Sequence, residues 1–169
     1  LVNDRVIVNR MAYDLFVPFT EARLLSWSDP ARGDIVVCRF PGEEDKNPWL
    51  KRIVGLPGDT IELRGPRLVV NGQGLSYEIL DRAAFADVPP GNRLGEVVAV
   101  ESGAGMKHRV TFDPEGARRT IDFGPLRVED RHYFVLGDSR DNSRDSRTLG
   151  PVPREQIFGK FAWVLFRGN

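Results

Sequence analysis

Short runs of β-branched and aromatic residues, each bounded by glycine, proline, asparagine or aspartate, recur along most of this chain. Such runs are typical of strands, and the residues between them are typical of tight turns. Gly65-Pro66 lies between two runs and Asn71-Gly72 follows the second, so both pairs predict hairpin turns. The pattern predicts a mostly β fold of short antiparallel strands in a compact, sandwich-like or barrel-like core. The expected strands are residues 5–9, 34–40, 50–55, 60–64, 67–71, 95–100, 107–112, 132–136 and 158–166.

The length of 169 residues suffices for one domain with a buried core and a smaller lobe. Patterning is weaker between residues 72 and 130, where loop signals are frequent. We therefore expect a core built from residues 1–71 and 131–169, with an inserted β-rich lobe at residues 72–130. Helices should be few, and the proline that opens residues 153–157 favours one helical turn there.

Charge and hydropathy exclude some classes of partner. Basic and acidic residues number 24 each, so no net field attracts nucleic acid, and we expect no nucleic-acid partner. No apolar run reaches the length of about 18 residues that a membrane span needs. The N-terminus also lacks the basic-then-apolar pattern of a targeting peptide. We expect no metal ion and no cofactor.

The single cysteine, Cys38, lies in an apolar run that predicts a strand. A catalytic thiol needs an accessible, electropositive setting and a histidine partner, and the chain has only His108 and His132. We expect Cys38 to be a small buried core residue instead.

An apolar segment near the N-terminus runs from Leu15 to Phe19 and continues at Leu24, Leu25 and Trp27. It carries more apolar surface than a loop between polar turns should expose. Packing into the core is the simpler interpretation, and contact with a lipid bilayer or a partner is the functional one.

Residues 51–59 read Lys-Arg-Ile-Val-Gly-Leu-Pro-Gly-Asp. A lysine and an arginine in an apolar strand are usually two surface charges. For Lys51 to accept a proton at neutral pH its amine must be desolvated, because burial disfavours the charged form. In a strand Lys51 shares a face with Trp49 and Ile53, which can supply an apolar setting, whereas Arg52 should face solvent or a carboxylate.

Residues 137–147 read Gly-Asp-Ser-Arg-Asp-Asn-Ser-Arg-Asp-Ser-Arg and directly follow an apolar run. A solvated loop is the simplest interpretation of so many polar residues. Buried or half-buried charges in such a loop would have to be paired.

The two blocks together resemble the signature blocks of the type I signal peptidases, whose Ser/Lys dyad uses a lysine in place of the histidine of a Ser/His/Asp triad. The resemblance covers nearly the whole chain outside residues 72–106. It implies that Lys51 is the general base and that Ser143 orients its amine. It also implies that Asp145 pairs with Arg147 to brace the loop. Asp145 and Arg147 are thus expected to give structural support, and so are Arg52, Asp141 and Arg140, because half-buried charges must be paired.

The same resemblance implies shallow apolar pockets for small side chains, lined by Val6, Val37 and Leu50; core packing is the alternative for each. Such pockets suit Ala-x-Ala segments, and the substrate would bind as an extended strand. The implied partners are the signal peptides of preproteins and, through the apolar segment and an N-terminal anchor, the surface of a lipid bilayer.

In the family the nucleophilic serine lies in a Ser-x-x-Pro segment, which by the resemblance would precede Leu1 together with the anchor. We therefore expect a membrane-associated serine endopeptidase at the outer face of the bacterial cytoplasmic membrane. The 169 residues by themselves should be inactive, because no other serine is a convincing nucleophile.

Two other functions stay open. One is a peptide-binding relative of the same fold that holds extended segments without cutting them. The other is a self-cleaving repressor-type Ser/Lys protein, which would need a scissile loop and a DNA-binding domain; the block after Lys51 and the balanced charge weigh against it.

Overall fold

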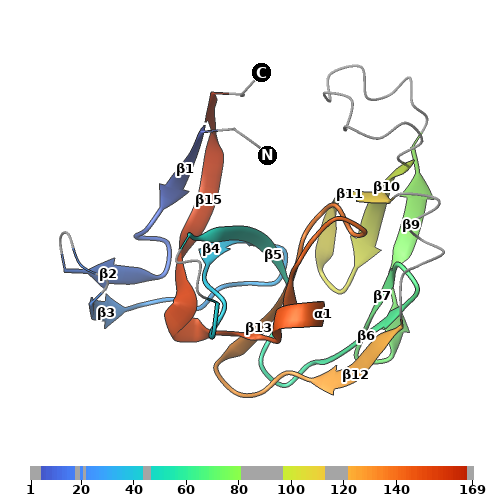
Figure 1. Cartoon of the computed structure of the whole chain (residues 1–169), viewed down its shortest axis with the longest axis horizontal. Helices are drawn as coiled ribbons and strands as arrows, with labels where there is room; N and C mark the ends of the chain where they lie inside the picture. Colours follow the sequence, from blue (N-terminus) through green and yellow to red (C-terminus); the bar gives the residue numbers. More distant parts are fainter. Residues whose placement is uncertain are drawn as a thin grey trace.

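The computed structural model describes residues 5–17, 20, 22–43, 47–80, 97–112 and 122–166. The main element is a six-stranded antiparallel sheet, which occupies the left and centre of Figure 1. Its strands, in spatial order, are β1 (Arg5–Asn9), β15 (Ile157–Phe166), β4 (Ile35–Cys38), β5 (Trp49–Gly55), β13 (His132–Leu136) and β14 (Val152–Pro153).

Two smaller sheets lie at the right of Figure 1. Turn chemistry explains the hairpins in the first of them: Gly65 follows β6 with φ of 56°, and Asn71 and Gly72 follow β7 with φ of 52° and 78°. Two consecutive positive φ angles, as at Asn71-Gly72, are characteristic of a type I′ hairpin turn, and a glycine with positive φ at the first central position, as at Gly65-Pro66, is characteristic of type II′. Since β6 pairs with β7 and β7 with β8 across these turns, both predicted turns are confirmed. The strands of this sheet are β12 (Phe123–Arg127), β6 (Thr60–Arg64), β7 (Arg67–Val70) and β8 (Gln73–Gly74). Those of the second are β11 (Met106–Phe112), β10 (Val97–Gly103) and β9 (Ser76–Ile79).

Strand β13 separates two hydrophobic cores. All its residues after His132 are buried, and their side chains alternate between the two faces of the sheet. Phe134 and Leu136 pack with the apolar residues of β6 and β7, whereas Tyr133 and Val135 pack with those of β4. Strand β13 therefore contributes side chains to both cores.

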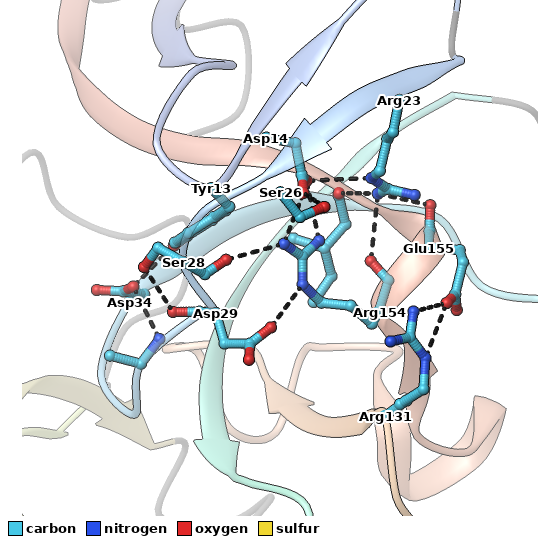
Figure 2. A network of polar contacts seen from close by, with 12 residues as sticks. Tyr13, Asp14, Arg23, Ser26, Ser28, Asp29, Asp34, Arg131, Arg154 and Glu155 are labelled. Atoms are coloured by element: carbon cyan, nitrogen blue, oxygen red, sulfur yellow. Dashed lines mark hydrogen bonds and ion pairs between the residues drawn. The ribbon is translucent and has the colours of Figure 1, made fainter.

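A hairpin of β2 (Asp14–Phe16) and β3 (Arg23–Ser26) lies at the far end of the long axis from the β9–β11 sheet (Figure 1). A buried ion pair fixes it: two nitrogens of Arg154 donate to the two oxygens of Asp14 at 2.9 and 2.8 Å (Figure 2). Asp14 also accepts from Ser26 and Arg23, and Arg23 donates to three backbone carbonyls between Arg154 and Ile157. The network attaches the hairpin to the end of the main sheet.

The prediction of a mostly β fold is confirmed, and the expected helical turn is a 3₁₀ turn at Arg154–Gln156. A four-residue helix α1 (Ser146–Leu149) was not predicted, and neither were the strands β2, β3, β8, β9, β12 and β14. The first two residues of the strand expected at 95–100 lie outside the described residues. The division into a core and a lobe at 72–130 stays a prediction; β12, which belongs to that segment, pairs with β6.

Within the described ranges, no helix is long and apolar enough to cross a membrane.

Candidate active site

Strand β5 places Lys51 at the centre of the main sheet. The first half of β5 pairs with β4, whereas β13 ends at Leu136, opposite Arg52. Lys51 is half-buried, and its amine lies 5.1 Å from the centre of the Trp49 ring, on the face that the strand alternation predicts. Burial lowers the pKa of the Lys51 amine below its ordinary value, although the Asp145 carboxylate acts in the opposite direction. This environment favours a neutral amine, which can accept a proton.

The loop after β13 brings Ser143 to Lys51. The Lys51 amine donates to the Ser143 hydroxyl at an N–O distance of 2.8 Å, although 92 residues separate the two in sequence. This hydrogen bond fixes the direction of the amine. In the neutral amine, the single lone pair is therefore available to a group on another side.

Gly137 makes room for this contact. A Cβ atom at residue 137 would lie 2.5 Å from the Cβ of Ser143 and 3.6 Å from the amine of Lys51. Gly137 has no positive φ, so space and not backbone conformation requires glycine here. The role of Gly137 was not predicted from sequence, although a glycine at the start of residues 137–147 could have indicated a close approach of two segments.

Asp145 and Arg147 lie side by side and hold the loop from its C-terminal side. Two nitrogens of Arg147 donate to the two oxygens of Asp145, both at 2.8 Å, and Asp145 is fully buried. Asp145 also accepts from the backbone nitrogen of Gly137 at 3.0 Å and caps α1. Arg147 donates to the backbone carbonyl of Ser143 at 3.3 Å. Both ends of the turn that carries Ser143 are thus attached to one carboxylate–guanidinium pair.

Arg52 points away from Lys51 and meets a carboxylate. It donates to both oxygens of Asp138, at 2.8 and 2.7 Å, and to the carbonyl of Gly33 at 2.8 Å. The pair joins β5 to the start of the Ser143 loop. Asp141 is half-buried in the turn at residues 140–142, and its structural role stays a prediction.

The three residues predicted to line pockets are not gathered in one place. Val37 and Leu50 face each other across β4 and β5, and both are half-buried. Strand alternation directs them to the face opposite Lys51. Val6 lies on β1, which pairs with β15 and not with β4.

Cys38 is fully buried next to this site, and burial raises the pKa of its thiol to about 12. The prediction of a buried core cysteine is confirmed. No group of three or more His, Cys, Asp or Glu side chains in the described part of the chain could hold a metal ion.

The apolar segment does not pack into the core as the simpler interpretation predicted. Leu24, Leu25 and Trp27 are 62%, 59% and 49% exposed. Leu24 and Leu25 lie on β3 and Trp27 follows it, in the hairpin at the end of the molecule that the Asp14 network attaches to the main sheet (Figures 1 and 2). Residues 18 and 19 of the segment lie outside the described residues.

Comparison with known proteins decides the family. The model of the family described as signal peptidase, peptidase S26, matches residues 1–166. This chain belongs to the signal peptidase family. A signal peptidase I of Pseudomonas fluorescens is 33% identical over 171 residues, which cover 94% of this chain and 57% of the relative. A signal peptidase I P of Bacillus subtilis subsp. natto is 34% identical over 165 residues, covering 97% and 68%.

The crystal structure of a signal peptidase I from Enterococcus faecalis aligns with a TM-score of 0.47 and 30% identity, covering 81% of this chain and all of that one. The chain spans 57% of the length of the two Pseudomonas members of the signal peptidase family that it matches.

Proposed function

We propose that this chain is the lysine-bearing part of a signal peptidase I, a serine endopeptidase that cleaves signal peptides from exported preproteins after Ala-x-Ala-like sites. The observation that carries the proposal is the 2.8 Å hydrogen bond between the half-buried Lys51 amine and Ser143. An amine with a lowered pKa and a fixed direction is what a general base for a serine hydroxyl requires. Membership of the signal peptidase family supports the same activity.

In the proposed reaction Lys51 accepts the proton of the nucleophilic serine as its oxygen attacks the scissile carbonyl carbon. The protonated amine then delivers that proton to the leaving amine as the carbon–nitrogen bond breaks, which leaves an acyl-enzyme. In the second half, Lys51 takes a proton from water as the water oxygen attacks the acyl carbon. The bond from that carbon to the serine oxygen then breaks, and the Lys51 amine returns the proton to the serine. Ser143 keeps the amine directed throughout.

The serine itself would come from a Ser-x-x-Pro segment that precedes residue 1. The backbone amide of that serine and a nearby hydroxyl would stabilise the oxyanion. By this proposal the 169 residues alone bind substrate without hydrolysing it.

The first half of β5 offers a place for the substrate, because of its two neighbours in the sheet only β4 pairs with it there. An extended peptide could add a strand along this edge, next to Lys51. Its side chains would alternate between the two faces of the sheet. Val37 and Leu50 on one face, and Val6 farther along the main sheet, are the proposed pocket residues.

The exposed side chains of Leu24, Leu25 and Trp27 would rest on the lipid surface, where burial of apolar area is favourable. Together with an N-terminal anchor, they would hold the enzyme at the outer face of the bacterial cytoplasmic membrane, where exported preproteins emerge.

The test extends the chain with the segment that its gene encodes upstream of Leu1 and incubates it with a preprotein that carries an Ala-x-Ala site. We expect the extended protein to cleave, the 169-residue chain not to cleave, and Lys51→Ala to abolish cleavage. Lys107→Ala removes an exposed lysine of β11 and is the matched control. Full cleavage by Lys51→Ala would refute the proposed base. Peptide binding without cleavage by the extended protein would indicate the non-cutting relative instead.

A further inference from the structure

The loop that carries Ser143 is also held from the side of the β9–β11 sheet. Thr111 of β11 donates its backbone N–H to the carbonyl of Asp138 at 2.9 Å. The backbone N–H of Arg140 donates to the carbonyl of Thr111 at 3.0 Å, and Ser139 forms a parallel bridge with Thr111. The loop therefore pairs with β11, at the edge of the β9–β11 sheet, for one residue pair.

A buried ion pair reinforces this attachment. Two nitrogens of Arg140 donate to the two oxygens of Glu101 on β10, both at 2.6 Å, and the two side chains are 1% and 0% exposed. The hydroxyl of Tyr77 on β9 donates to the same carboxylate. A buried bidentate pair fixes the orientation of both partners, and removing one partner leaves an uncompensated buried charge.

His108, the cross-strand neighbour of Glu101, links this pair to the strand of Lys51. Its Nε2 atom lies 3.3 Å from a Glu101 oxygen and 3.9 Å from an oxygen of Asp138, which binds Arg52. The side chain of His108 is 7% exposed, and burial lowers its pKa to about 4, so the ring is neutral near pH 7. The Arg52–Asp138 pair and the Arg140–Glu101 pair thus both lie next to the uncharged His108 ring.

We propose that Glu101 is a positioning residue for the Lys51–Ser143 pair, acting through Arg140. This inference rests on the proposed role of Lys51 as the base. Three ion pairs hold the turn that carries Ser143: the Asp145–Arg147 pair, the Arg52–Asp138 pair at the start of the loop, and the Glu101–Arg140 pair before Ser143. Residues of the expected lobe at 72–130 are by this inference part of the catalytic apparatus.

The physical consequence concerns the environment of Lys51. Removing the charge of Glu101 leaves the Arg140 guanidinium buried without a counter-ion, so the loop must move to let it reach water. Movement of the loop weakens the contact of Ser143 with Lys51 and admits water to the amine. The pKa of Lys51 should then rise toward its ordinary value, and less of the amine is neutral at a given pH.

The test measures the titration of Lys51 by NMR in the 169-residue chain labelled in its lysine side chains. The chain contains four lysines, and Lys51→Met identifies the Lys51 signal by its loss. We expect Glu101→Gln to raise the pKa of Lys51. Asp14→Asn is the matched control, because Asp14 forms a buried bidentate pair of the same kind with Arg154 at the other end of the molecule (Figures 1 and 2). It should leave the titration of Lys51 unchanged.

A milder pair of variants decides the matter if Glu101→Gln does not fold. Tyr77→Phe removes a hydroxyl that donates to Glu101, and Ser26→Ala removes one that donates to Asp14 at 2.7 Å. Tyr77→Phe should move the Lys51 titration in the same direction as Glu101→Gln but less, and Ser26→Ala should not move it. An unchanged titration in every folded variant, or equal changes in the variants and their controls, would overturn the inference.

Cleavage by the extended protein separates this inference from the proposed function. Glu101→Gln should lower kcat at neutral pH by about tenfold to a hundredfold, the effect of a small misplacement at a reacting group, with little change in KM. If Lys51→Ala abolishes cleavage while Glu101→Gln has normal kcat, Lys51 remains the proposed base and the positioning role of Glu101 is refuted. If Lys51→Ala retains cleavage, the proposed function falls whatever the NMR titration shows.

Discussion

Replacing Gly137 by alanine gives the most direct test of the Lys51–Ser143 geometry. The new Cβ would lie 2.5 Å from the Cβ of Ser143, whereas nonbonded carbon atoms prefer about 3.5 Å. Ser143 must therefore move by about 1 Å, which is enough to break a hydrogen bond of 2.8 Å to Lys51 if the movement is away from the amine. Overpacking of this kind costs about 1–3 kcal/mol of stability, and a misplacement of this size lowers turnover by about a hundredfold.

The assay compares Gly137→Ala with Gly74→Ala, because a Cβ at Gly74 would meet no atom within 4 Å. Urea unfolding of the 169-residue chain gives the stability, lysine NMR gives the titration of Lys51, and cleavage by the extended protein gives turnover. We expect Gly137→Ala to raise the pKa of Lys51, to lower stability and to lose most turnover, and Gly74→Ala to change none of them. Normal turnover with an unchanged Lys51 titration in Gly137→Ala would refute the argument that Ser143 must sit directly over Gly137.

Three further predictions concern stability and surfaces. Burial lowers the pKa of Lys51, so the unfolded state binds more protons, and stability rises with pH between the folded and unfolded pKa values. Lys51→Met should therefore raise the free energy of unfolding at pH 7 by about 1 kcal/mol. Urea unfolding should show a smaller gain at pH 10 than at pH 7. Burial alone would raise the pKa of Asp14, but hydrogen bonds led by that from Arg154 hold it below its usual range, so its stabilisation is present above its unfolded pKa and lost on acidification. Asp14→Asn should cost about 3 kcal/mol at pH 7, and urea unfolding should show the difference from the parent narrowing below about pH 4; an unchanged difference would contradict this. Leu24→Ser should weaken binding to phosphatidylglycerol–phosphatidylethanolamine vesicles about tenfold, measured by co-sedimentation. Ile79→Ser, which changes a side chain 73% exposed on β9, should leave that binding unchanged. Equal losses of binding in the two variants would argue against a defined lipid-binding face.

Several strands could be predicted because local patterns determine them. β1, β6 and β13 begin and end at the residues that the apolar runs predict, and the Asn71-Gly72 turn follows from the positive φ angles that these two residues tolerate. Strands β2, β3, β8, β9, β12 and β14 could not be predicted in this way. β3 exposes leucines instead of burying them, and β12 contains a proline and an irregular register with β6.

The candidate site could be predicted only in part from sequence. The two blocks indicated Lys51 and Ser143 because their residue types resemble a known pair, and Arg52 meets a carboxylate as expected. The partner of Arg140 could not be found in this way. Glu101 lies 39 residues earlier in the chain, and no local pattern distinguishes a glutamate that is fully buried against an arginine from one that faces solvent.

Strand β13 has a consequence for how the protein loses activity. Tyr133 and Val135 belong to one core and Phe134 and Leu136 to the other, so this strand cannot open without disrupting both. Its amide hydrogens should therefore exchange with solvent among the slowest in the chain, by global unfolding and not by local fluctuation. Gly137 follows β13 directly, so the turn that carries Ser143 starts from this slowly exchanging segment. Heating should consequently abolish the Lys51–Ser143 contact and the native fold in a single cooperative transition, without an inactive intermediate that retains both cores.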